Sequence, residues 1–168
     1  GATLALWLAL REEAKNLNAL VLLSPNFGPR NKLAGLAAGP WGDQITRLLV
    51  GAPREFTPKN DEHAQGWTTR YRSEAIPTLM GLVKLSERLK LRNLKTPTLI
   101  AYSPNDKVVD PTLIERRFSE LGKAPKELIP YEEPGDSSYH VLAGRILSPR
   151  NTAPLLAQVS RFLRKLPE

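Results

Sequence analysis

Asp106 and His140 have the residue types and the sequence settings that acid–base chemistry needs. Asp106 follows the apolar stretch 98–102 (TLIAY), and His140 lies in the loop 132–143, after the stretch 126–131 (KELIPY). A carboxylate bonded to a histidine orients the imidazole and stabilises its protonated form, so that the histidine can take a proton from a hydroxyl. Such a pair supplies two of the three groups of a nucleophilic catalytic triad. The alternatives are that Asp106 is a turn residue and that His140 is a structural histidine.

Other polar residues near this pair are predicted to have local structural roles. Asp110 directly precedes Pro111 and is predicted to cap a helix. Asp136 lies in the stretch PGDSS and is predicted to stabilise a turn. His63 lies among acidic residues and is predicted to be at the surface. No serine stands in a G-x-S-x-G pattern, so the sequence identifies no nucleophile among the serines in turn contexts, which are Ser24, Ser103, Ser137 and Ser138.

The stretches that must position this pair are predicted to form parallel strands. Residues 19–23 (ALVLL) and 98–102 are apolar without alternation, which is typical of strands buried on both faces. Residues 126–131 are predicted to be a third strand, and Pro130 favours an edge position. Because the carboxyl ends of neighbouring parallel strands meet at one edge of a sheet, we expect the loops of Asp106 and His140 to meet.

Helices are predicted over residues 3–16, 40–50, 74–91, 110–121 and 151–166. The first is apolar all round at its start and is therefore expected to be buried on all sides. Since chain termini usually lie at the surface, and since the chain does not begin with Met, we expect it to be the C-terminal part of a longer protein. Gly122 is predicted to end the fourth helix. In the last helix the residues predicted to face the core are Leu155, Leu156, Val159, Phe162 and Leu163.

Residues 29–93 differ from the rest of the chain. They contain many glycines and prolines, no strand signal, and a long polar, irregular stretch over residues 51–72. We therefore predict a helical cap over residues 29–93, inserted into an α/β core that is formed by residues 1–28 and 94–168.

Composition narrows the range of functions. The chain has no Cys and only two His, so we predict no disulfide, no thiol chemistry and no metal site; the absence of Cys is compatible with a cytosolic protein. No apolar run reaches the length of a membrane span. The net charge is +7, which leaves a non-catalytic basic binding module as an alternative function. The densest basic run contains no interleaved aromatic residue, so it is interpreted as a solvated face without nucleic-acid binding; it comprises Lys84, Arg88, Lys90, Arg92 and Lys95.

The order of these elements resembles the C-terminal portion of the α/β-hydrolase superfamily, most closely its monoacylglycerol-lipase and serine-aminopeptidase-like branch of esterases and lipases. The stretches that carry the resemblance are GATLALWLAL (1–10), TPTLIAYSPNDKVVDP (96–111), SSYHVLAG (137–144) and QVSRFL (158–163). The resemblance implies an α/β fold of parallel strands with packing helices and a helical lid. It also implies a serine hydrolase that cleaves carboxylic esters, small or lipid-like, without a cofactor.

The resemblance further implies the roles of individual residues. His140 would be the general base and Asp106 its orienting acid. Gly1 resembles the last Gly of the nucleophile elbow, which would place the Ser two residues before Gly1. This chain alone would then be inactive, and its partner would be the missing N-terminal half, as part of the same protein or as a separate chain. An Asp nucleophile at that position, as in dehalogenases and epoxide hydrolases, is the alternative. Apolar lid residues would line the substrate pocket; they are Trp41, Leu48, Leu79, Met80 and Val83.

Overall fold

Three parallel strands form the sheet at the centre of the molecule. In the computed structural model, which describes residues 1–33, 41, 44 and 54–166, they are β1 (Leu20–Leu23), β4 (Thr98–Tyr102) and β5 (Lys126–Pro130), in the order β1-β4-β5. All five residues of the middle strand, β4, are buried, as its unbroken apolar sequence predicts. The predicted parallel strands are confirmed, and β5 is an edge strand of this sheet and ends at Pro130.

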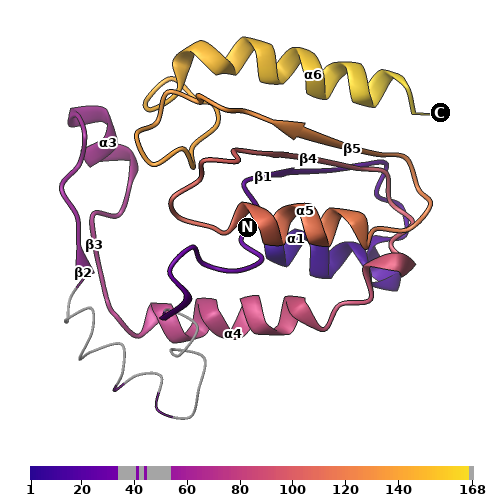
Figure 1. Cartoon of the computed structure of the whole chain (residues 1–168), viewed down its shortest axis with the longest axis horizontal. Helices are drawn as coiled ribbons and strands as arrows, with labels where there is room; N and C mark the ends of the chain where they lie inside the picture. The colour runs from indigo at the N-terminus through magenta and orange to yellow at the C-terminus, as the bar shows by residue number, and fades with distance from the viewer. Residues whose placement is uncertain (34–40, 42–43, 45–53, 167–168) are drawn as a thin grey trace.

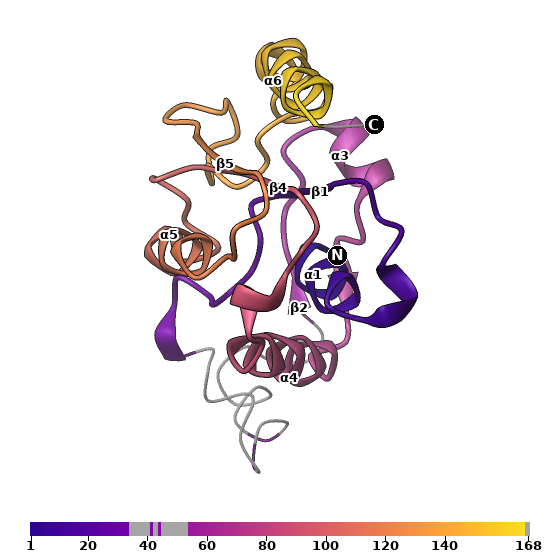
Figure 2. The ribbon, with the colours of Figure 1, turned by 90° about the vertical axis from the view of Figure 1, so that its right-hand side faces the viewer.

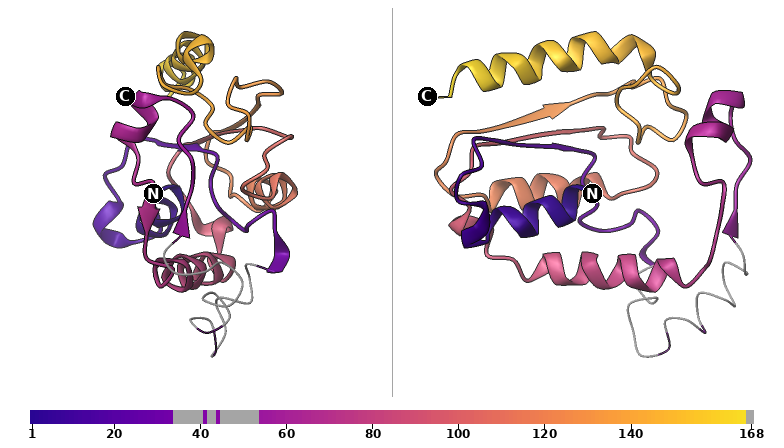
Figure 3. Two further views of the ribbon diagram at one scale, coloured as in Figure 1. Left: turned by 90° about the vertical axis from the view of Figure 1, so that its left-hand side faces the viewer. Right: turned by 180° about the vertical axis from the view of Figure 1, so that it is seen from behind.

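Helices lie on both faces of the sheet. They are α1 (Ala2–Ala9), α3 (Asp61–Gly66), α4 (Ala75–Glu87), α5 (Pro111–Ser119) and α6 (Thr152–Arg164), with the 3-10 turns η1 (Glu12–Ala14), η3 (Leu91–Asn93) and η4 (Pro149–Asn151). Figures 1 and 2 show α6 on one face, α1 and α5 on the other, and α4 as a further layer beyond α1 and α5. The view from behind in Figure 3 shows the same order of layers.

The side chains of β4 alternate between two hydrophobic cores. Ile100 packs with Leu22 of β1 in the core on the side of α1 and α5. Leu99 and Ala101 point the other way and pack with Phe162 of α6. Fully burying a large apolar side chain stabilises a fold by about 1.5–3 kcal/mol, so β4 contributes to the stability of both layers at once.

Helix α1 is shorter and more exposed than the sequence predicts. The predicted helix 3–16 stops at Ala9 and is followed by the short turn η1. Leu6 is 1% exposed, but Leu4 and Leu8 are 52% and 45% exposed. The prediction of burial on all sides was therefore wrong for this structure. The reason is that α1 packs on β1 and α4, so one stripe of an all-apolar helix stays uncovered by the described residues.

Strand β1 is likewise buried on only one face. Leu20 and Leu22 are buried, whereas Val21 and Leu23 are 36% and 45% exposed. The prediction of burial on both faces was wrong here because the core under α6 includes residues of β4 but none from Leu20–Leu23, so nothing in that core covers this face of β1.

Helix α6 presents a narrower apolar stripe than predicted. Leu155 and Phe162 are buried and Val159 is partly buried, at the spacing of one helical face. Leu156 and Leu163 are 64% and 44% exposed, so their predicted burial was wrong. They flank the stripe on a helix that has the sheet on only one side.

The region predicted to be a cap contains α3, α4 and one small ladder. β2 (Arg54–Glu55) pairs antiparallel with β3 (Arg70–Tyr71), so the prediction of no strand in this region was wrong; four mostly polar residues carry no apolar alternation that could have indicated it. Helix α4 confirms the helix predicted over 74–91, with an earlier end. Most of the helix predicted over 40–50 lies outside the described residues.

Gly122 serves a different purpose from the predicted one. Helix α5 ends at Ser119, and Glu120 follows it in the right-handed helical region, so the prediction that Gly122 caps the helix was wrong. A Cβ atom at Gly122 would lie 2.5 Å from the carbonyl oxygen of Arg92 and 3.3 Å from that of Leu94. Close contact between two backbone segments therefore requires a glycine at this position.

We expect Gly122→Ala to lower the free energy of unfolding by about 1–3 kcal/mol, because the backbone atoms that the new methyl group meets cannot swing away. Urea denaturation of the chain measures this. Gly81→Ala is the matched control: Gly81 lies inside α4, and no atom lies within 4 Å of the position that its new methyl group would take. Its replacement should raise stability by about 0.5–1 kcal/mol. Equal effects of the two substitutions would contradict the steric explanation.

Candidate active site

The loops that carry the candidate acid and base meet at one edge of the sheet. β1, β4 and β5 run parallel, so their carboxyl ends lie together. Ser24 follows β1, Asp106 lies in the loop after β4, and His140 lies in the loop after β5. Figure 1 shows this edge on the left, where the loop after β5 lies toward α3. The expectation that the Asp106 and His140 loops meet is confirmed.

Asp106 is buried, with a side chain that is 0% exposed. Its Oδ1 accepts hydrogen bonds from the backbone N–H groups of Val108, at 2.7 Å, and Val109, at 2.9 Å. Its Oδ2 lies 2.8 Å from Nδ1 of His140. The turn residues after β4 thus wrap the chain around the carboxylate, which leaves one oxygen directed at the histidine. The side chain of Asp110 accepts from the N–H of Thr112, so its predicted role as a helix cap is confirmed.

His140 is held through its ring and through its backbone. Because a carboxylate only accepts hydrogen bonds, the contact with Asp106 places the ring proton on Nδ1 and leaves the lone pair on Nε2. The side chain is 30% exposed. Its backbone N–H donates to Oδ2 of Asp136 at 3.2 Å, and its carbonyl accepts from the hydroxyl of Ser24 at 2.7 Å. An imidazole in this state can accept a proton through Nε2.

Ser24 donates a hydrogen bond to the backbone of residues 132–143, the loop that carries His140 and is called the histidine loop below. Its φ angle is +43°, which is unusual for a residue with a side chain. Its hydroxyl donates to the carbonyl of His140, and its N–H donates to the carbonyl of Ala101 at 2.8 Å. The strained turn after β1 therefore directs this hydroxyl at the histidine loop, where it stabilises the backbone.

Asp136 makes more contacts than its predicted turn role requires. Its side chain is 0% exposed, and it accepts hydrogen bonds from the backbone N–H groups of His140 and Val141, from the hydroxyl of Ser138 and from Nζ of Lys59. Burial by itself would raise the pKa of Asp136, but the bonds from Lys59, Ser138 and the two N–H groups outweigh it and hold that pKa well below its usual value. The sequence analysis did not predict the bond between Asp136 and Lys59. The one signal in the sequence for a role of Asp136 is its position four residues before His140.

His63 is buried, so the prediction that it lies at the surface was wrong. Its ring packs between Phe56 and Trp67, with centroid separations of 5.5 Å and 4.9 Å. Its Nδ1 accepts from the backbone N–H of Lys59 at 3.1 Å. The charged neighbours of His63 suggested exposure, but aromatic residues on either side of it fold over the ring.

Of the residues predicted to line a substrate pocket, two are buried and two are exposed, and one lies outside the described residues. Met80 and Val83 are buried and pack with Ile76. Leu79, on the same helix, is 45% exposed, and Trp41 is 68% exposed. Leu48 lies outside the described residues. The structure brings Met80 and Val83 together, and it leaves apolar surface at Leu79 and Trp41.

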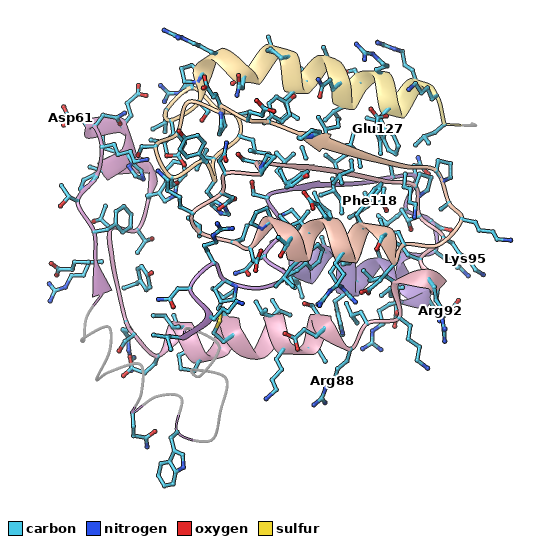
Figure 4. The ribbon with its side chains drawn as sticks, in the orientation of Figure 1. Asp61, Arg88, Arg92, Lys95, Phe118 and Glu127 are labelled. Carbon is cyan, nitrogen blue, oxygen red and sulfur yellow. The ribbon has the colours of Figure 1, made fainter. Side chains whose placement is uncertain are left out.

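The dense basic run lies away from Asp106 and His140. All five of its residues are exposed. Figure 4 shows Arg92 and Lys95 at the end of the molecule opposite α3, and Arg88 extending outward from the last turn of α4. A surface hollow of about 750 Å³ at this end is lined by Arg92, Asn93, Leu94, Lys95, Gly122, Lys123 and Ala124. These residues precede β4 and β5, so the hollow is at the opposite edge of the sheet from the candidate acid and base.

The described part of the chain contains neither a membrane-spanning helix nor a metal-binding cluster. None of its helices is long and apolar enough to cross a membrane. Residues 1–33, 41, 44 and 54–166 contain no group of three or more His, Cys, Asp or Glu side chains arranged to hold a metal ion.

Similarity to known proteins is found in structure and not in sequence. No family model matches the chain, and no curated protein matches it. Among solved structures, a monoglyceride lipase from Saccharomyces cerevisiae matches 98% of this chain with a TM-score of 0.69 and 16% identity. A metagenome-derived lipolytic enzyme matches 98% with a TM-score of 0.70 and 21% identity. The monoacylglycerol lipase of Paleococcus ferrophilus matches 98% with a TM-score of 0.66 and 14% identity.

These matches concern the fold. The chain spans 62%, 61% and 65% of the lengths of the three lipolytic proteins. At such low identity the likeness is limited to the arrangement of strands and helices. This is the α/β arrangement that the resemblance in sequence predicts. The chain has a partial α/β-hydrolase fold, consistent with the C-terminal portion of that fold, in which helices cover a parallel sheet and Asp106 and His140 meet at the carboxyl ends of its strands.

Proposed function

We propose that this chain forms part of a serine hydrolase that cleaves carboxylic esters, with His140 as general base and Asp106 as its orienting acid. The observation that carries the proposal is the 2.8 Å contact between Nδ1 of His140 and the buried carboxylate of Asp106. This contact leaves Nε2 with a lone pair on a partly exposed ring. The lipolytic enzymes that share the fold support ester hydrolysis as the reaction class.

The nucleophile in this proposal is a serine two residues before Gly1 in a longer protein, or in a separate chain that assembles with this one. Two features support a covering segment of that kind. The solved lipolytic structures contain more chain than this one matches. Leu4 and Leu8 on α1, and Val21 and Leu23 on the face of β1 that points away from α1, are exposed apolar side chains that further chain beside the edge of β1 would bury.

In the proposed reaction His140 moves one proton in each half of the cycle. Nε2 takes the hydroxyl proton while the serine oxygen bonds to the acyl carbon, and Asp106 stabilises the imidazolium that forms. Nε2 then gives the proton to the departing alcohol. A water molecule then attacks the acyl-enzyme while Nε2 takes its proton; the bond to the serine oxygen breaks, Nε2 returns the proton to that oxygen, and the acid leaves. Backbone N–H groups around the serine hold the oxyanion, each contributing about 3–4 kcal/mol.

The substrate class in this proposal is an ester with an apolar acyl group, as in a lipid. Residues 29–93 would form the cap, and the antiparallel bridge between Pro29 and Val109 supports a boundary there, where the chain leaves the core. Leu79 and Trp41 would contact the acyl group, since their side chains are exposed on this part of the chain. Met80 and Val83 would support that surface from inside.

In the protein that includes the nucleophile, we expect His140→Ala and Asp106→Asn each to lower kcat for a short-chain nitrophenyl ester by about 10⁴-fold. Asp110→Asn is the matched control: it makes the same chemical change in the same loop, and asparagine caps a helix as well as aspartate does, so kcat should be unchanged. Fluorophosphonate labelling should occur in that protein and not in residues 1–168 alone. Labelling of the isolated chain would contradict the assignment, and turnover of a haloalkane or an epoxide without labelling would indicate the aspartate nucleophile.

We also expect the isolated chain to self-associate through the edge strand β1 and its exposed side chains Val21 and Leu23. Val21→Lys should shift it toward monomer, because a charged side chain on an open strand edge opposes pairing. Analytical ultracentrifugation measures the shift. Leu156→Lys, at a leucine that is 64% exposed on α6, is the control and should leave the distribution unchanged. A monomeric wild-type chain with a sharp, reversible thermal transition would refute this expectation.

A further inference from the structure

One carboxylate connects the candidate base with the segment 54–74, which contains β2, α3 and β3 and is called the cap segment below. Asp136 is fully buried, and Lys59 of the cap segment donates to its Oδ1 from a side chain that is 38% exposed. The other oxygen, Oδ2, accepts from the backbone N–H groups of His140 and Val141, both at 3.2 Å. The same side chain therefore holds the cap segment with one oxygen and the histidine loop with the other.

The histidine loop needs this support because its backbone is strained. Tyr139, directly before His140, has a φ angle of +58°, which side-chain-bearing residues rarely adopt. The N–H of Tyr139 donates to the carbonyl of Asp136 at 2.8 Å, and the hydroxyl of Ser138 donates to the Asp136 carboxylate. Backbone and side chain of Asp136 together close a tight turn that ends at the candidate base.

Lys59 reaches Asp136 from an ordered turn. Its own N–H donates to Nδ1 of the buried His63 at 3.1 Å, and the side chain of the next residue, Asn60, accepts from the N–H of His63 at 2.7 Å as the cap of α3. Asn60 also donates to the carbonyl of Ile146 at 3.3 Å, in the stretch between His140 and η4. The cap segment is thus docked on the histidine loop with Lys59 already in place.

We propose that Asp136 is a positioning residue for His140, and that Lys59 makes this positioning depend on the docking of the cap segment. A buried carboxylate that loses its cation is strongly disfavoured, so undocking of the cap segment would release the Asp136 turn and with it the backbone of His140. Coupling of this kind is reciprocal, so an ordered histidine loop also favours the docked cap segment. The inference deepens the proposed ester hydrolysis and rests on it for its catalytic consequence.

The test compares Lys59→Met, Asp136→Asn and the double variant in the protein that includes the nucleophile. Asparagine keeps an oxygen for the two N–H groups but removes the charge that pairs with Lys59. We therefore expect each single variant to lower kcat for a short-chain nitrophenyl ester about 10-fold with little change in KM. The double variant should lose no more than either single one. Lys59→Arg, which keeps the charge, should retain most of the activity.

Arg145→Met is the matched control. Arg145 pairs with Glu62 at 2.5 Å and so joins the same two segments, but both side chains are more than half exposed and the pair does not involve Asp136. Its loss should leave kcat within about twofold, since exposed ion pairs contribute little. Equal losses in Arg145→Met and Lys59→Met, additive losses in the double variant, or full activity in Lys59→Met would each overturn the proposal.

A second measurement separates this inference from the proposed function. Amide hydrogen exchange at His140 and Val141, followed by NMR, should be about 10-fold faster in Lys59→Met than in the wild type or in Arg145→Met. This readout does not require catalysis. If no ester is hydrolysed but exchange changes as expected, the proposed function fails and the coupling stands; unchanged exchange overturns the coupling even in an active esterase.

Discussion

The burial of β4 on both faces is the constraint on which the rest of the structure depends. Its five residues are all buried, so its backbone N–H and C=O groups must pair with strands on both sides, which are β1 and β5. Its side chains need a helical layer on each face, which α6 supplies on one side and α1 and α5 on the other. The polar loop that ends the strand must then emerge at the edge of the sheet, and Asp106 lies in that loop.

Two buried carboxylates at that edge decide the shapes of the loops. Asp106 and Asp136 each have a side chain that is 0% exposed, and a buried charge is tolerated only when its oxygens receive hydrogen bonds. Asp106 receives two backbone N–H groups and the ring of His140; Asp136 receives the N–H group of His140 and other donors. His140 is therefore held by two carboxylates: Asp106 binds its ring, and Asp136 binds its backbone N–H. The hydroxyl of Ser24 binds its backbone carbonyl.

Through this arrangement the cap segment contacts the residue that holds the backbone of His140, whereas a simple cover over a pocket would only exclude solvent. A segment that packs only through apolar side chains can shift without leaving a buried charge unpaired. The ammonium group of Lys59 on the carboxylate of Asp136 is different, because it compensates a carboxylate that solvent does not reach. The aromatic packing around His63 fixes the turn that carries Lys59, so a residue far from the proposed chemistry becomes part of its support.

The sequence by itself determined the parallel strands, the cap at Asp110 and the meeting of the Asp106 and His140 loops. An unbroken apolar stretch such as 98–102 favours a strand in a parallel sheet. A cap depends on residues next to it, and strand direction fixes where the loops emerge. Only the tertiary structure decided the pairing of Asp136 with Lys59, which are 77 residues apart, the burial of His63 and the exposure of Leu8 and Val21. These features depend on which surfaces from distant parts of the chain come together, and no local pattern of residues specifies that.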